Sequence, residues 1–144
     1  MGTLLKISDA AALAFHATSL LAAQDGKALS TKSIATTLRA SECHLSKVLQ
    51  RLAKAGLVSS VRGPRGGFTL ATDPATVSLL DVYEAIEGPF VPGDCLLKIR
   101  VCDPNGERML GGLLGEINQR VKDCLSRTHL ASLTHLYQGR ESDC

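Results

Sequence analysis

One segment, residues 41–68, restricts the fold of this chain more than any other. It reads SECHLSKVLQRLAKAGLVSSVRGPRGGF. Ser41 is suited to cap a helix over residues 42–54, and Gly56 stands where a left-handed C-terminal cap belongs. A basic β-hairpin is expected directly afterwards, with a tight loop of Arg and Gly at its turn. A helix followed by such a hairpin suits a DNA major groove with phosphates on either side, and enzymes seldom need it.

The segments around this unit carry the signals of further helices. Three serines precede apolar positions that recur at helical spacing, which predicts helix starts. The expected helices are 9–23 after Ser8, 31–38 after Ser30 and 79–87 after Ser78, and the expected strands are 57–61 and 68–71. Two short helices with a brief turn and a hairpin predict a winged helix-turn-helix. The expected fold class is mainly α.

A long helix, residues 107–127, is expected near the C-terminus, followed by a two-turn helix. Apolar side chains recur along it in steps of four and three, the seam spacing of a coiled coil. These are Leu110, Leu114, Ile117, Val121 and Cys124. The expected regions are a winged helix-turn-helix over 1–87, a Cys-containing loop over 88–106, and the long helix with the short terminal one over 107–144.

Positive charge is concentrated in one part of the chain. Residues 27–67 hold eight Lys and Arg residues against the single acid Glu42, a balance of +7. The rest of the chain holds eight basic and thirteen acidic residues, a balance of −5. A basic block within an acidic chain is the electrostatic pattern expected for phosphate contact, although charge alone also fits a solvated surface.

Composition excludes several classes of protein. No apolar run reaches the roughly 18 residues of a membrane span, and no signal-peptide pattern opens the chain. The chain contains five cysteines, an odd number, and no CxxC motif, which argues against a disulfide framework, a zinc ribbon and a thiol redox enzyme. No nucleotide-binding loop, hydrolase triad or carboxylate pair is present. We therefore expect a cytoplasmic protein that is not an enzyme.

The run GLVSSVRGPRGGFTLA, with LSKVLQRLAKA before it and SLLDVYEAIEG after it, resembles the Rrf-two family of bacterial winged-helix transcription regulators. The resemblance covers nearly the whole chain. The family includes regulators of iron–sulfur assembly, nitric-oxide response and cysteine metabolism. Its members are homodimers through the long helix and bind palindromic operators, usually as repressors. The resemblance thus implies that the 110–124 seam is a dimer interface and that double-stranded DNA is the partner.

The candidate DNA contacts follow from the expected helix and hairpin and from the family resemblance. Short polar groups at the start of helix 42–54 would meet base edges, while basic side chains further along would reach phosphates or guanine. Wing arginines would enter the minor groove or bind its phosphates. The candidates are Lys32, Ser41, Cys43, His44, Ser46, Lys47, Arg51, Arg62, Arg65 and Gly66. Two depart from the usual family pattern: Cys43 takes a slot often filled by Ser, and Arg65 replaces a Gly.

The signal remains open between alternatives. Cys102 precedes an expected helix N-terminus and Cys43 starts another, a setting that favours thiolate and therefore oxidation, so thiol-based control through both is one hypothesis. Family members that bind an iron–sulfur cluster place three Cys in the loop. This loop supplies Cys95 and Cys102, with Asp9 at a position that serves as a partner-subunit ligand in some members. As an alternative, Asp9 is simply an acid in a helix first turn.

A small-molecule effector is a third possibility for the signal. For the whole chain, the competing class is a winged helix that docks proteins and touches no nucleic acid.

Overall fold

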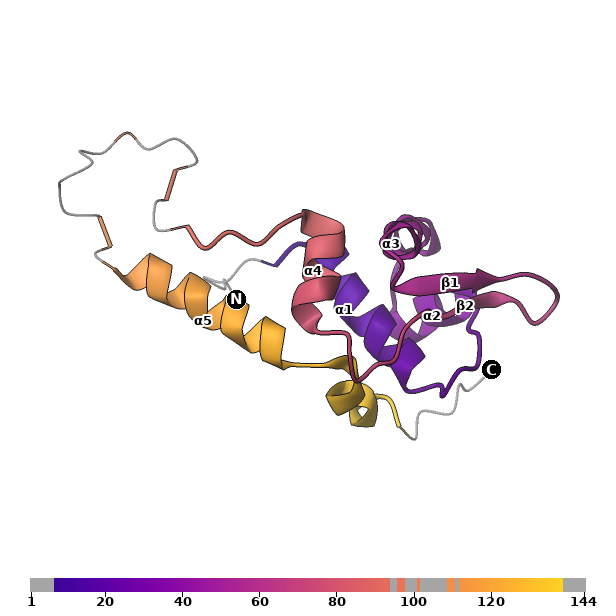
Figure 1. Ribbon diagram of the computed structural model, residues 1–144. Coiled ribbons are helices and arrows are strands. Elements are labelled where there is room, and N and C mark those ends of the chain that lie inside the picture. The colour runs from indigo at the N-terminus through magenta and orange to yellow at the C-terminus, as the bar shows by residue number, and fades with distance from the viewer. Residues whose placement is uncertain (1–6, 94–95, 98–100, 102–108, 111, 139–144) are drawn as a thin grey trace.

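Helices form most of the structure, and a two-stranded hairpin projects from them (Figure 1). The computed structural model describes residues 7–93, 96–97, 101, 109–110 and 112–138. The elements are α1 (Asp9–Ala22), α2 (Thr31–Leu38), α3 (Glu42–Lys54), β1 (Val58–Val61), β2 (Gly67–Leu70), α4 (Leu79–Glu87), α5 (Leu113–Arg127) and the 3₁₀-helix η1 (Leu130–Leu136). The predicted mainly-α winged helix-turn-helix is confirmed.

Serine caps define where α1 to α4 begin. The hydroxyl oxygens of Ser8, Ser30, Ser41 and Ser78 each accept a hydrogen bond from the backbone amide three residues later. This bond satisfies one of the free amides that every helix N-terminus leaves. At Ser78 the bond is reciprocal, because the Asp81 carboxylate accepts from the Ser78 amide at 2.9 Å. These four helix starts therefore agree with the predicted ones.

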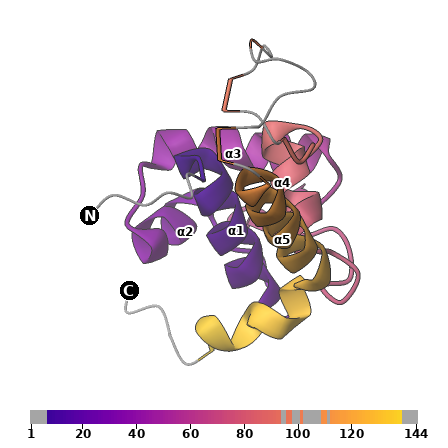
Figure 2. The ribbon, with the colours of Figure 1, turned by 90° about the vertical axis from the view of Figure 1, so that its left-hand side faces the viewer.

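α1 forms the centre of the core, with α2, α3, α4 and η1 packed around it (Figure 2). Its inner positions include Ala11, Ala14 and Ala17, none of which is exposed to solvent. Small side chains let the neighbouring helices approach closely, and larger ones fill the remaining space. The largest fully buried side chains include Ile34, Leu45, Leu49, Leu52 and Leu130. The core is aliphatic, as expected for a chain with only 3% aromatic residues.

The β1–β2 hairpin is tied to the body of the domain at its base. Its strands pair antiparallel, from Val58 opposite Leu70 to Val61 opposite Gly67. Leu29, just before α2, adds a bridge in which its amide donates to the Phe68 carbonyl at 3.0 Å and its carbonyl accepts from the Phe68 amide at 2.7 Å. The far end of the hairpin extends away from the helices (Figure 1).

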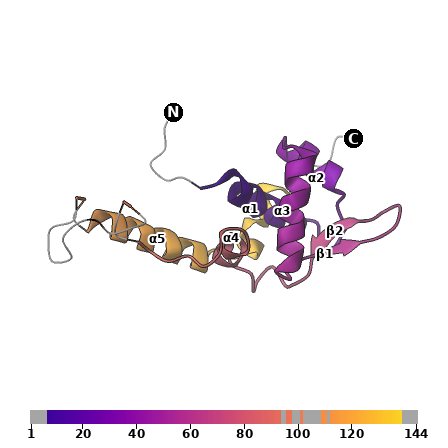
Figure 3. The same ribbon diagram turned by 90° about the horizontal axis from the view of Figure 1, so that it is seen from above.

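One prediction about the C-terminal region is wrong. α5 begins at Leu113 instead of residue 107, with Met109 and Leu110 in a turn and Gly112 as an N-cap that has no side-chain hydrogen bond. The glycines around this start lower helix propensity, which accounts for the later beginning. The predicted two-turn helix after α5 is present, as the 3₁₀-helix η1. α5 points away from the winged helix (Figures 1 and 3).

Among the helices in the described part of the chain, none is long and apolar enough to span a lipid bilayer.

Candidate nucleic-acid interface

α3 separates an inner side from an exposed side. Leu45, Val48, Leu49 and Leu52 are buried, and they recur at helical spacing. The residues that sequence analysis assigns to DNA lie mostly on the opposite side. Ser41, Cys43, His44, Lys47 and Arg51 are exposed, Ser46 is half-buried, and Lys32 is exposed on α2. The side chains that could reach DNA from α3 are therefore held on a helix whose other side is locked into the core.

Ser41 has a structural task in addition to any contact with DNA. Its hydroxyl oxygen accepts from the His44 amide at 3.3 Å, which caps α3. The preceding turn is tight because Arg39 adopts the left-handed conformation at a φ of 53°. The start of α3 is thus rigid at the position where its first-turn side chains, Cys43 and His44, leave the helix.

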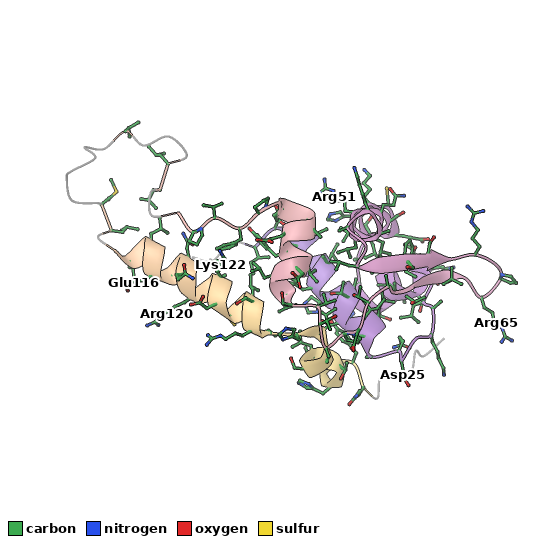
Figure 4. All side chains as sticks on the ribbon, viewed as in Figure 1. Asp25, Arg51, Arg65, Glu116, Arg120 and Lys122 are labelled. Atoms are coloured by element: carbon green, nitrogen blue, oxygen red, sulfur yellow. The ribbon has the colours of Figure 1, made fainter. Side chains whose placement is uncertain are left out.

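The turn of the hairpin presents two arginines. Arg62 and Arg65 are both exposed, and Figure 4 shows Arg65 at the far end of the hairpin, away from the helices. Gly66 is needed inside the turn: a Cβ there would overlap the Val61 carbonyl and lie 2.8 Å from the carbonyl oxygen of Gly63. The absence of a side chain at Gly66 therefore has an intramolecular reason, whether or not its backbone also approaches DNA.

Two of the candidate sensor residues have a described environment. Cys43 is exposed in the first turn of α3 and is a free thiol. Asp9 is exposed in the first turn of α1, next to the Ser8 cap. Cys95 and Cys102 lie outside the described residues. Within the described residues, no three His, Cys, Asp or Glu side chains form a group that could hold a metal ion.

The predicted seam on α5 divides into two parts. Leu114 and Val121 are half-buried and lie in line with the buried Leu125. Ile117 and Cys124 are exposed, and Leu110 is exposed but lies outside the helix. Sequence analysis missed Leu113, which is 52% exposed and one turn before Ile117. The four-residue spacing between Leu113 and Ile117 would have identified Leu113 as a seam residue if the start of the helix had been known.

Several interactions at the C-terminal end of α4 were not predicted. The Ser8 hydroxyl donates to the Glu87 carboxylate, and the Phe90 amide donates to the Glu84 carboxylate at 3.0 Å. The Tyr83 and Phe90 rings meet edge to face, with centroids 5.4 Å apart. Burial, aided by the negative charge of Glu87, raises the pKa of the Tyr83 phenol. The exit from α4 is therefore an ordered part of the molecule.

The chain is similar to known transcription regulators. Residues 7–136 match the family described as "Rrf2: Iron-dependent Transcriptional regulator". The chain is 33% identical to the HTH-type transcriptional regulator CymR of Bacillus subtilis over 112 residues, which cover 78% of this chain and 76% of CymR.

Solved structures agree as well. The structure of CymR, the global cysteine regulator of B. subtilis, is similar with a TM-score of 0.77 and 32% identity, over 92% of this chain and 98% of that one. T. potens IscR is similar with a TM-score of 0.71 and 26% identity, over 98% and 95%. These matches favour a DNA-binding regulator over a protein-docking module or an enzyme. The chain belongs to the Rrf2 family of DNA-binding transcription regulators.

Proposed function

We propose that the protein is a homodimeric, cytoplasmic repressor of a palindromic operator. Each protomer would place α3 in a major groove and the β1–β2 hairpin against the neighbouring minor groove. The observation that carries the proposal is the exposure of one side of α3 together with Arg62 and Arg65 at the hairpin turn. α3 packs against β1, so the two elements would dock as one unit.

Roles within this interface follow from chemistry and position. Side chains at the start of α3 are short and polar, which suits hydrogen bonds to base edges. Lysines and arginines suit phosphates and the electronegative minor groove. The proposed base contacts are Ser41, Cys43, His44 and Ser46, and the proposed backbone or groove contacts are Lys32, Lys47, Arg62, Arg65 and Gly66.

Arg62→Gln is expected to weaken operator binding roughly tenfold and to lower the slope of log K against log salt concentration by about one, because one phosphate contact is lost. Binding would be measured by fluorescence anisotropy on the chain's own promoter between roughly 50 and 200 mM salt. Arg127→Gln is the matched control, since it removes the same charge from an exposed position on α5. Equal binding by wild type and Arg62→Gln would show that the wing has been misassigned.

The dimer interface is proposed to use the exposed apolar positions of α5. Leu113 and Ile117, at 52% and 41% exposure, and the exposed Cys124 lie on one flank of the helix. The half-buried Leu114 and Val121 adjoin this flank. A partner that covered these side chains would remove apolar surface from water, and two linked protomers would read the two halves of a palindrome.

Ile117→Glu is expected to raise the dimer dissociation constant at least 100-fold, because a carboxylate would be buried without a partner. Sedimentation velocity over a concentration series would measure this change. Ser126→Glu adds the same charge at another exposed position of α5 and should leave the assembly intact. An Ile117→Glu protein that remains dimeric at nanomolar concentration would rule out this face.

The signal is proposed to be oxidation of Cys43, with Cys102 as a second reactive thiol. Hydrogen peroxide would convert the exposed Cys43 thiol to a sulfenic acid and be reduced to water. The added oxygen would then lie where α3 must approach the bases. Oxidation would therefore release the operator.

Peroxide treatment is expected to lower operator affinity at least tenfold in wild type and in Cys124→Ser, but not in the Cys43→Ser, Cys102→Ser double variant. Cys124 is the control because it is a free thiol on α5, outside the proposed DNA contacts. Release from the double variant would exclude control through Cys43 and Cys102. Anaerobic purification tests the alternative cluster bound through Cys95, Cys102 and Asp9: a brown protein with stoichiometric iron would replace the thiol proposal.

A further inference from the structure

Arg51 differs from the other basic residues of α3 in its surroundings. It lies in the last turn of the helix, and its guanidinium is directed toward α4, where Nη1 donates to the backbone carbonyl of Ile86 at 3.5 Å. Figure 4 shows Arg51 on the side of α3 that faces α4. At 3.6 residues per turn, Cys43, Lys47 and Lys54 lie on the side of α3 opposite its buried residues. Arg51 is rotated from that side toward α4.

The carbonyl that Arg51 binds needs a donor. The last four carbonyls of a helix have no partner within the helix. At the end of α4, the Gly88 amide donates to the Glu84 carbonyl, and the chain then leaves the helix because Gly88 adopts a φ of 82°. Ile86 is only 9% exposed, which limits the access of water to its carbonyl. Arg51 supplies both a hydrogen-bond donor and a positive charge at the negative end of the α4 dipole.

The end of α4 is itself held by other elements. Glu87 accepts from Ser8 at the start of α1. Further along, the Asn118 side chain on α5 donates to the Gly93 carbonyl at 2.6 Å. The exit from α4 is thus bound to α1 and α5, and Arg51 adds α3 to this junction.

We propose that Arg51 is a positioning residue for DNA recognition: it holds the recognition helix against the C-terminal end of α4 and does not itself contact DNA. This assignment deepens the proposed interface and replaces the phosphate or guanine contact expected for Arg51 from its sequence position. Its consequence is that the junction joining α1, α4 and α5 sets the angle at which α3 enters the groove.

The test compares Arg51→Gln with Lys47→Gln and Lys54→Gln, each of which removes one charge from α3. Operator affinity is measured across a salt series at 10 °C, with circular dichroism to establish that each variant is folded. Arg51→Gln is expected to lose affinity roughly three- to thirtyfold, with a salt slope like that of the wild-type protein. Lys47→Gln is expected to lower the slope by about one.

Hydrogen exchange of the DNA-free protein gives a second readout. The Gly88 amide should exchange faster in Arg51→Gln than in Lys54→Gln, whereas a DNA contact would leave the free protein unchanged. The inference is overturned if the slope for Arg51→Gln falls by about one relative to wild type, or if its affinity equals that of wild type. A Lys47→Gln protein with an unaltered slope would instead count against the proposed interface, and the Arg51 comparison would still stand.

Discussion

Gly67→Ala is expected to loosen the base of the hairpin and to reduce operator affinity at least tenfold. A Cβ at Gly67 would overlap the carbonyl of Leu29 and lie 2.7 Å from the amide nitrogen of Ser30. Both are backbone atoms, so no side chain can rotate away. Gly67 also has a φ of 155°, which costs a non-glycine residue on the order of 1–3 kcal/mol. The hairpin must therefore move, and with it the two wing arginines.

The measurement is operator binding together with the midpoint of thermal unfolding. Gly63→Ala is the matched control, because Gly63 also has a positive φ, 110°, but a Cβ there would meet nothing within 4 Å. Gly63→Ala therefore has the conformational cost of a positive φ but no steric overlap with neighbouring atoms. We expect Gly63→Ala to retain most of the affinity. Equal losses for the two variants would show that backbone conformation, and not the contact with Leu29, determines the position of the hairpin.

Leu49→Ala is expected to lower the free energy of unfolding by roughly 2–5 kcal/mol. Leu49 is completely buried in the core between α3 and its neighbours. The truncation removes apolar contacts and leaves a cavity, because a packed interior closes only in part. A domain of this size is stable by only about 5–15 kcal/mol, so the loss is a large share of the total.

Urea denaturation followed by circular dichroism would measure this loss. Leu136→Ala removes the same atoms from a side chain that is 52% exposed and should cost less than about 1 kcal/mol. Leu49→Met is a second control, since it nearly conserves volume and should cost less than roughly 1.5 kcal/mol. A Leu49→Ala protein as stable as Leu136→Ala would mean that α3 is not packed into the core as described.

Local signals explain why the winged helix could be predicted so closely. Each of α1 to α4 starts after a serine that caps it, and capping depends only on residues within one turn. Gly56 adopts the left-handed conformation expected of a residue that follows a helix. The strands lie within one residue of the predicted ones. In each case the interacting groups are close along the chain, so their spacing in the sequence contains the information.

The predictions for α5 were less accurate than those for α1 to α4. The predicted start of α5 is six residues too early. The apolar spacing begins at Leu110, but the glycines that follow lower helix propensity, so the helix begins only at Leu113. Leu114 and Val121 have the same spacing as Ile117 and Cys124, yet the first pair is half-buried and the second pair is exposed. Spacing identifies an apolar side of a helix, and only a neighbouring element divides it.

Local sequence signals were sufficient to predict the helix caps, the basic hairpin and hence the DNA-binding class, because these depend on short-range hydrogen bonds and on the charge of individual residues. Tertiary structure alone decided that Arg51 binds α4, that Gly67 must lack a side chain beside Leu29, and that α5 keeps an exposed apolar flank. The physical reason is that each of these depends on how closely backbones from separate segments approach, and that distance is set by the packing of the whole core.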